Sequence, residues 1–419
     1  MKHSPTIKDS TGRILDSLPN DRTTRRLFDG SAWYYSTTAT ERVQSDATYA
    51  AGVVTYKAGL PANAAYKIGC YYFPGWVDGG VAARPLPWEL LDEYPERWPM
   101  QGKYQEGSQY VAENQLRQMA YAGIDFMAVD WYWNGATFLN NAVDAFKIAI
   151  PAISSPVKYC LMWDNSLSGG TYPTTLTDWQ NIYTHWITTH FKDGAATRPA
   201  YHTIDGKPVV ILFSPDALRT RANALYPAYA ASETATLQML TAANDAAIAA
   251  GLTGIYFVGC MRAQNFWVGA GKYMANNGYS AQTAYLTHYE LSDHNTTAGP
   301  LAHTYSDLDQ INQSEWAWNI ENGSIPYFVP VASGWDRRPW GGSGVAPYND
   351  AAHDNCTPTE AEWSAHLVAA KQAVDANQGR TANTLMVYAW NELGEGGYIE
   401  PTQGRRVSFL DQIKSVFST

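Results

Sequence analysis

The chain has 419 residues, enough for two average domains or for one large α/β barrel with an appendage. Apolar residues make up 45% of it, an ordinary share for a globular protein, whereas charged residues make up only 16%. The net charge is −10 and no basic run is present, which argues against nucleic acid or anionic membranes as partners.

Neither the termini nor the cysteines settle the compartment. The first ten residues, MKHSPTIKDS, contain no apolar h-region, so no signal peptide is visible, and no apolar run approaches the roughly 18 residues that span a bilayer. Cys70, Cys160, Cys260 and Cys356 lie far apart without zinc-ligand spacing, which favours buried free thiols over disulfides. We favour action outside the cytoplasm, as a secreted, periplasmic, or virion- or surface-borne protein.

Residues 1–65 differ in composition from the rest of the chain. They are rich in Thr, Ser, Ala and Tyr with short alternating stretches, a pattern typical of short β-strands. We expect a small β-rich N-terminal extension there, whose role is unknown.

Residues 66–419 alternate between short apolar runs and helical patterns. The runs cover residues 67–76, 124–133, 157–165, 207–215, 254–261, 280–288, 325–335 and 384–392. Near-continuous apolar strands separated by helices are typical of a parallel sheet covered on its outer side. Eight such units predict a (β/α)8 TIM barrel. A doubly wound open sheet is the alternative, but it would need a glycine-rich phosphate turn after an early strand, and none is present.

Helix signals separate most of the runs. Apolar residues recur every three or four positions from Leu176 to Trp186. Thr359 and Glu362 have the spacing of a capping box before the last run, and a final amphipathic helix is expected to end near Phe417.

The functional groups of such a barrel lie at the carboxyl ends of its strands. Six of the eight runs end in Trp or Tyr beside a carboxylate, His, Asn or Arg. The candidate substrate-binding residues are Tyr71, Tyr72, Asp130, Trp131, Trp133, Trp163, Asp164, His288, Trp335, Asp336, Arg337, Asn391 and Tyr398. Aromatic faces pack on sugar rings while Tyr and Trp keep a polar group, so the pattern predicts an oligo- or polysaccharide site with Trp131 and Trp335 as stacking platforms.

Each of these residues also has a structural interpretation. Asp130 or Asp164 could cap the helix that follows, and Asp336 could pair with an arginine beside it. His288 could be a half-buried histidine with satisfied hydrogen bonds. The high aromatic content, 13% of the chain, could reflect a Trp-rich core.

The stretch YAWNELGEGGYIEP, residues 388–401, resists a purely structural interpretation. Strand alternation would send Glu392 and Glu395 to opposite faces, but the glycines after Leu393 indicate a turn, in which residues three apart can converge. Two neighbouring carboxylates have their pKa values pushed apart and can then act as proton donor and base. Glu392 and Glu395 are therefore the catalytic candidates, with a third acid, Glu400, nearby.

This stretch resembles the signature of glycoside hydrolase family 99 and its WbsX-like relatives, W-N-E-x-x-E-G-x-x-x-E-P. YYFPGW in the first run and GWDRRPW in the seventh also match in order. The resemblance spans residues 67–418 and implies a (β/α)8 barrel and retaining, endo-acting cleavage of α-mannosidic glycans. It implies that Glu392 deprotonates the 2-hydroxyl of the substrate, giving a 1,2-anhydro sugar, and that Glu395 is the general acid/base. Leu393 stands where these relatives carry Trp.

The leading hypothesis is a retaining glycoside hydrolase that acts within an α-linked polysaccharide, α-mannan-like or a bacterial or algal exopolysaccharide, without cofactor or metal. The alternatives are a glycosyltransferase and a non-catalytic carbohydrate-binding or attachment protein. A transferase would want a D-x-D metal site or a phosphate-binding loop, and the only D-x-D is SDLDQI at an apparent helix start. The two intact glutamates argue against a non-catalytic protein. The oligomeric state is open.

Overall fold

The computed structural model describes residues 66–79, 86–166, 172–194, 196–261, 273–291, 298–344 and 348–417, and four short strands before residue 66. These strands are β1 (Ile7–Lys8), β2 (Ile14–Leu15), β3 (Arg25–Phe28) and β4 (Trp33–Ser36). They pair antiparallel, β1 with β2 and β3 with β4, in keeping with the β-rich composition of this segment. A division of the chain at residue 65 stays a proposal.

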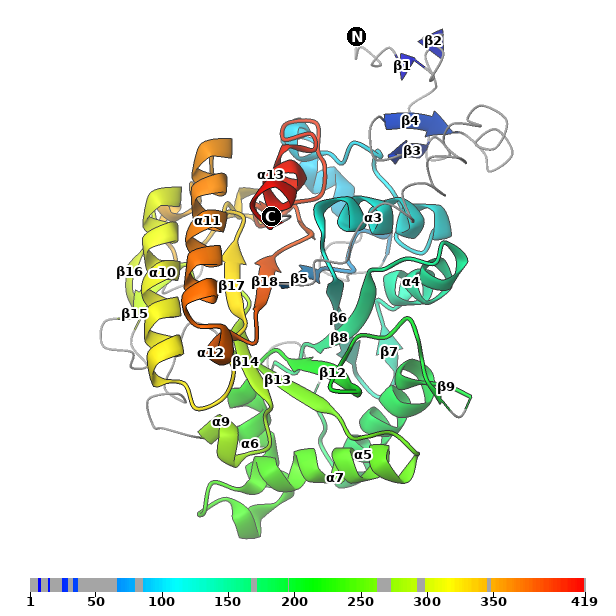
Figure 1. The fold of residues 1–419 in the computed structure, drawn as a ribbon, viewed down its shortest axis with the longest axis vertical. Helices are drawn as coiled ribbons and strands as arrows, with labels where there is room; N and C mark the ends of the chain where they lie inside the picture. The colour runs from blue at the N-terminus through cyan, green and yellow to red at the C-terminus, as the bar shows by residue number, and fades with distance from the viewer. Residues whose placement is uncertain are drawn as a thin grey trace.

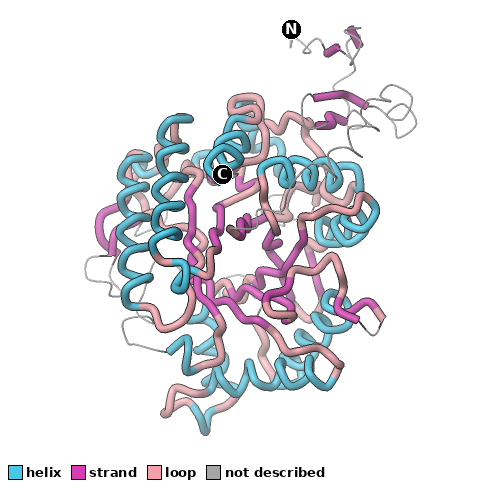
Figure 2. The backbone as a smooth tube through the Cα atoms, in the orientation of Figure 1, coloured by secondary structure: helices cyan, strands magenta, loops and turns pink. Residues whose placement is uncertain are grey.

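Eight parallel strands form the centre of the molecule (Figure 2). They are β5 (Lys67–Tyr72), β6 (Phe126–Trp133), β8 (Lys158–Trp163), β12 (Lys207–Leu212), β13 (Tyr256–Met261), β14 (Ala281–Ala284), β17 (Val329–Ala332) and β18 (Thr384–Tyr388). Each lies inside one of the eight apolar runs. Neighbours follow chain order, and β18 pairs with β5.

The barrel closes between β14 and β17 through a short contact. Gln282 N–H donates to Pro326 O at 2.9 Å, and Phe328 N–H donates to Gln282 O at 2.8 Å. With this bridge the eight strands form a nearly closed (β/α)8 barrel, and the predicted fold is confirmed.

Helices surround the strands (Figure 1). They are α3 (Gln109–Ala122), α4 (Asn141–Ala152), α5 (Leu176–His185), the π-helix η3 (Trp186–Phe191), α6 (Pro215–Leu225), α7 (Ala235–Ala249), α9 (Tyr273–Asn276), α10 (Tyr305–Asn322), α11 (Glu360–Ala376), α12 (Gln378–Thr381) and α13 (Ser408–Phe417). No helix in the described part of the chain is both long and apolar enough to cross a bilayer.

The connections carry small elements. The short 3-10 helices are η1 (Pro87–Leu91), η2 (Pro95–Arg97), η4 (Pro227–Tyr229), η5 (Arg338–Trp340) and η6 (Ala351–His353). The short strands are β7 (Thr137–Phe138), β9 (Lys192–Asp193), β10 (Ala196–Thr197), β11 (Thr203–Ile204), β15 (Tyr289–Leu291), β16 (Ala298–Leu301), β19 (Asn391–Glu392) and β20 (Gly397–Tyr398).

Helix α11 shows how the sequence signals become packing. Thr359 accepts a hydrogen bond from Glu362 N–H at 3.2 Å, and the Glu362 carboxylate accepts one from Thr359 N–H at 2.8 Å, so the predicted capping box is confirmed. Trp363 on the inner face is fully buried and stacks on Phe409 of α13, with ring centroids 5.1 Å apart. This contact packs α13, the last helix of the chain, against α11.

The four cysteines are free and buried, in agreement with the prediction of buried free thiols.

Replacing Trp363 with Ala should lower the free energy of unfolding by about 3–5 kcal/mol, because it leaves a cavity between α11 and α13. Val368→Ala on the same helix is the matched control: its side chain is 41% exposed, so we expect a change within about 0.5 kcal/mol. Denaturant titration of both variants measures the difference. Equal losses would contradict this account of the α11–α13 interface.

Candidate active site

Alternation along β6 decides which of its side chains reach the barrel interior. Trp131 is 1% exposed and packs on Trp186 of η3, with centroids 5.8 Å apart. Trp133 donates from Nε1 to Asp178 of α5 at 3.3 Å. Both rings therefore point outward, toward the helices, whereas Asp130, the residue before Trp131, points inward toward Glu392 and Glu395.

The same rule places two further candidates outside. Tyr72 is buried and donates its hydroxyl to Gln115 of α3 at 3.1 Å. Trp163 is buried and stacks on Trp179 of α5 at 5.7 Å. Four predicted binding residues, Tyr72, Trp131, Trp133 and Trp163, thus lie between strands and helices. The prediction of Trp131 as a sugar platform is corrected, because no ligand reaches a ring sealed there.

Tyr71 crosses the interior instead. Its hydroxyl donates to Ala284 O, at the end of β14, at 3.0 Å, although β5 and β14 are not neighbours in the barrel. Its ring lies 4.7 Å from that of Tyr285, which follows β14. The carboxyl end of the barrel is therefore filled by phenol rings from opposite strands.

The two glutamates are presented by the hairpin of β19 and β20, which follows β18. Glu395 N–H donates to Glu392 O at 3.1 Å, so the residues between them form a tight turn. The Glu392 carboxylate accepts the hydroxyl of Tyr285 at 2.7 Å, and the Glu395 carboxylate accepts that of Tyr388 at 2.7 Å. The two phenol rings touch, with centroids 4.9 Å apart, and this contact draws both carboxylates to one place.

Tyr285 and Tyr388 were not among the predicted site residues. Tyr388 is the last residue of β18, an apolar run in which no alternation of polarity marks the inward face. Tyr285 lies just past a strand end without a distinctive pattern around it.

Asp130 is a third acid at this site. It is 6% exposed, and its Oδ1 has no hydrogen-bond partner among the described residues. Burial raises the pKa of Asp130 well above its usual value, and the nearby negative charges of Glu392, Asp164 and Glu395 add to the shift. Its surroundings therefore favour the protonated form of Asp130.

Asp164 and Arg337 flank these acids. Asp164 is half-buried and accepts Ser166 N–H at 3.0 Å, a local turn contact. The Arg337 guanidinium Nε lies 3.9 Å from Glu395 Oε1. Both side chains stay candidates for substrate contact.

Asp336 has a structural role, contrary to its prediction as a substrate-binding residue. It is 1% exposed and forms ion pairs with Arg97 and with Arg338, the latter at 2.6 Å. Burial alone would raise the pKa of Asp336, but the hydrogen bond from Arg338 and the charge of Arg97 hold it below its usual value.

This ion pair supports the acid turn directly. Arg97 donates to Leu393 O at 2.9 Å and to Asp336 O at 2.9 Å, while Asp336 N–H donates to Glu395 O at 2.7 Å. Gly396 follows with φ +78°, and a Cβ there would lie 2.5 Å from Asp336 N. The turn is thus fixed by Arg97 and by the backbone of Asp336 in the loop after β17.

Asn391 and Tyr398 are also structural here. Asn391 is fully buried and exchanges hydrogen bonds with the backbone of Phe73, at 2.8 Å and 2.9 Å. Tyr398 is 4% exposed beneath the guanidinium of Arg405. Both hold the hairpin in place, so their prediction as substrate ligands is corrected.

His288 and Trp335 belong to a separate aromatic cluster, with ring centroids 4.5 Å apart. His353 Nδ1–H donates to Ala302 O at 2.7 Å, so its Nε2 accepts from His288 Nδ1 at 2.6 Å. Burial lowers the pKa of His353, consistent with a neutral ring. Trp335 is only 7% exposed, which leaves little of its ring for a sugar.

Glu400 lies away from the other acids. Its carboxylate accepts hydrogen bonds from Gln101 at 2.6 Å, Tyr104 at 2.9 Å and Gln115 at 3.2 Å. Burial raises the pKa of Glu400 to about 7. Glu400 ties the loop before α3 to the hairpin.

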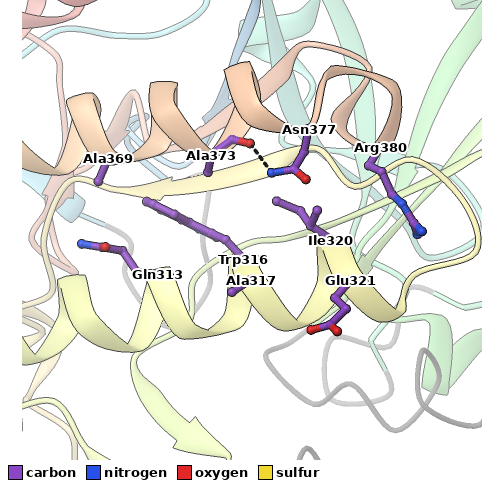
Figure 3. A pocket seen from close by; sticks show the side chains of 9 residues that line it. All are labelled: Gln313, Trp316, Ala317, Ile320, Glu321, Ala369, Ala373, Asn377 and Arg380. Carbon is purple, nitrogen blue, oxygen red and sulfur yellow. Dashed lines mark hydrogen bonds between the residues drawn. The ribbon is translucent and has the colours of Figure 1, made fainter.

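A groove of about 530 Å³ lies between α10 and α11, on the outside of the barrel (Figure 3). It is lined by Gln313, Trp316, Ala317, Ile320, Glu321, Ala369, Ala373, Asn377 and Arg380. Its single acid has no carboxylate partner in the lining, so the groove lacks the acid pair that the hairpin presents.

The family model described as glycosyltransferase WbsX matches residues 92–413, well over half of the chain. The chain belongs to the WbsX family. Two solved structures of the GH99 endo-α-mannosidase from Bacteroides thetaiotaomicron, one with BIS-TRIS-Propane bound, resemble it with a TM-score of 0.52, covering 84% of this chain and 98% of theirs. Their sequence identities are 10% and 13%, so the likeness concerns the fold. None of the curated proteins compared with the chain matches it.

Arg97→Ala should cost about 3–5 kcal/mol of unfolding free energy, because it removes one partner of a buried ion pair. Arg338→Ala is the matched control: Arg338 also binds Asp336, but its side chain is 56% exposed, so we expect at most about 1 kcal/mol. Chemical denaturation of both variants tests the ranking, and a larger loss for Arg338→Ala would overturn it.

Asp130→Asn keeps the shape of the side chain and removes its ionisation. The pKa of an aspartate in an unfolded chain is about 4, and that of Asp130 in the folded protein is higher. The free energy of unfolding of the wild-type protein should therefore fall as the pH rises from the first value toward the second, because ionising Asp130 is harder in the folded state. Relative to wild type, the melting temperature of the variant should therefore rise steadily between pH 4 and pH 8. Thermal melts across this range provide the measurement, and a pH-independent difference would show that Asp130 is not held neutral.

Proposed function

We propose that this protein is a retaining glycoside hydrolase that cleaves within chains of an α-linked polysaccharide. The observation that carries the proposal is the acid pair: Glu392 and Glu395 share one turn at the carboxyl end of the barrel, and each accepts a phenol hydrogen bond. Most glycoside hydrolases use two carboxyl groups, one on each side of the glycosidic bond that they cleave. The solved endo-α-mannosidases with the same fold support the substrate class.

In this proposal Glu392 accepts the proton of the substrate's 2-hydroxyl, whose oxygen then attacks the anomeric carbon and forms a 1,2-anhydro sugar. Glu395 gives its proton to the leaving glycosidic oxygen and afterwards takes one from the water that opens the anhydro ring, while Glu392 returns its proton to the 2-oxygen. Tyr285 and Tyr388 orient the two carboxylates, and Arg337 lies 3.9 Å from Glu395. The net retention follows from two successive inversions at the anomeric carbon.

A glycosyltransferase is the second candidate, because the family description names that activity. Both aspartates of the D-x-D sequence, which could hold a metal for a sugar nucleotide, make contacts within the protein. Asp307 forms the capping box of α10 with Thr304, and Asp309 pairs with His366 at 2.6 Å. These contacts favour the hydrolase.

Substitution of either glutamate should lower the rate about 10²–10⁴-fold, but for different reasons. Glu395→Gln loses the proton donor, so its loss should be smallest on a substrate with an activated leaving group. Glu392→Gln loses the base for the 2-hydroxyl and should gain little from a better leaving group. A screen of α-linked yeast, bacterial and algal polysaccharides first identifies the substrate, and steady-state kinetics on it and an aryl glycoside compare the variants.

The stereochemistry of early turnover, followed at the anomeric proton by NMR, decides the route. Retention together with an inert 2-deoxy substrate supports the anhydro sugar. First formation of the inverted anomer would refute it and make the pair an ordinary acid and a water-activating base. Release of sugar only from an activated sugar nucleotide would favour the transferase.

A further inference from the structure

Two aromatic rings that the sequence did not single out lie beside the acid turn. Trp340 ends η5, and Phe73 follows β5; both are half-buried. A Cβ on Gly394 would lie 1.9–2.3 Å from atoms of the Trp340 indole. The indole therefore rests directly on the backbone between Glu392 and Glu395, and only glycine permits that approach.

The indole of Trp340 is held by a layered stack. It stacks on Trp76 with ring centroids 5.5 Å apart, and the ring of Trp76 is tilted against that of Trp88 at 4.5 Å. Trp76 is fully buried and donates from Nε1 to Asn391 O at 2.8 Å, which anchors the stack to the hairpin. Trp340 is half-buried, whereas Trp76 and Trp88 are buried.

Phe73 closes one edge of the stack. Its ring meets Trp76 at 6.4 Å and Trp340 at 6.5 Å, both nearly perpendicular. Its backbone exchanges two hydrogen bonds with Asn391, next to Glu392. Both half-buried rings are thus fixed relative to the acid turn by contacts one residue away from a glutamate.

A half-buried aromatic ring fixed beside carboxylates suits a pyranose ring, whose apolar face stacks on the indole while its hydroxyls stay in contact with polar groups. The fixed stack also means that little conformational freedom is lost on binding.

We propose that Trp340, with Phe73 at its edge, is a stacking subsite for one sugar ring of a polysaccharide next to the acid pair. This inference rests on the proposed function, because it assumes that the site binds a glycan chain. It names the residues that position the chain. It replaces Trp131 as the platform and places the bound ring along the turn that carries Glu392 and Glu395.

The test is the affinity of Trp340→Ala for polysaccharides in the Glu395→Gln background, which prevents turnover. Affinity electrophoresis in gels containing yeast α-mannan, dextran or pullulan measures binding to each polymer. We expect Trp340→Ala to weaken binding at least about tenfold, as for aromatic hot spots, and Trp340→Phe to weaken it less.

Trp98→Ala is the matched control. Trp98 packs against the same cluster and is half-buried, but Lys103 covers its ring face at 4.5 Å and its Nε1 donates to Leu91 O. Its loss should leave binding unchanged. Equal weakening by both substitutions, unchanged binding in Trp340→Ala, or no binding of the parent to any of the three polymers would overturn the subsite.

The two proposals fail separately. Cleavage of a polymer by the wild type without any effect of Trp340→Ala on KM or binding removes the subsite and leaves the hydrolase. Trp340-dependent binding by a wild-type protein that cleaves none of the bound polymers keeps the subsite and removes the hydrolase.

Discussion

Two carboxylates three residues apart can serve one site only if the chain between them is held in a turn, and a buried ion pair imposes that turn. Arg97 comes from the loop before α3 and Asp336 from the loop after β17, so three separate connections meet at Leu393 and Glu395. Arginine suits this position because its fork can donate to two carbonyls and a carboxylate at once, which a lysine ammonium could not do with the same geometry. Burial of the pair is tolerated because each charge finds a partner.

The position of the turn also brings several acidic side chains close together. Asp130, Asp164, Glu392 and Glu395 gather at one end of the barrel with Arg337 as the nearest cation to Glu395. Four ionised carboxylates so close together would repel one another, and the burial of Asp130, whose Oδ1 has no partner among the described residues, favours its protonated form. The other two at the hairpin receive phenol hydroxyls, which fix their direction. Different partners thus give chemically identical groups different roles.

The sequence was sufficient for the fold and for the turn between Glu392 and Glu395. Eight apolar runs gave eight strands, and the capping box before α11 formed as its spacing required. It was insufficient for the direction of aromatic side chains, because strands buried on both faces show no alternation of polarity. Asp130 could have indicated the direction: if its carboxyl group faces the barrel interior, strand alternation places Trp131 and Trp133 toward the helices. Tyr285, Phe73 and Trp340 lie in connections, and their approach to the hairpin depends on long-range packing that no local pattern encodes.

The aromatic content itself has two physical explanations. Trp131, Trp163, Trp179 and Trp186 contact one another between the strands and α5 with η3, where they serve as core. The composition that first suggested a sugar-binding protein is therefore largely a property of the barrel's outer packing. The rings beside the acid turn differ in being held on a buried stack with one member half-exposed, and their position against Gly394 follows from the hairpin. The case for carbohydrate chemistry accordingly depends on where a few rings and carboxylates meet, and the number of Trp residues adds little to it.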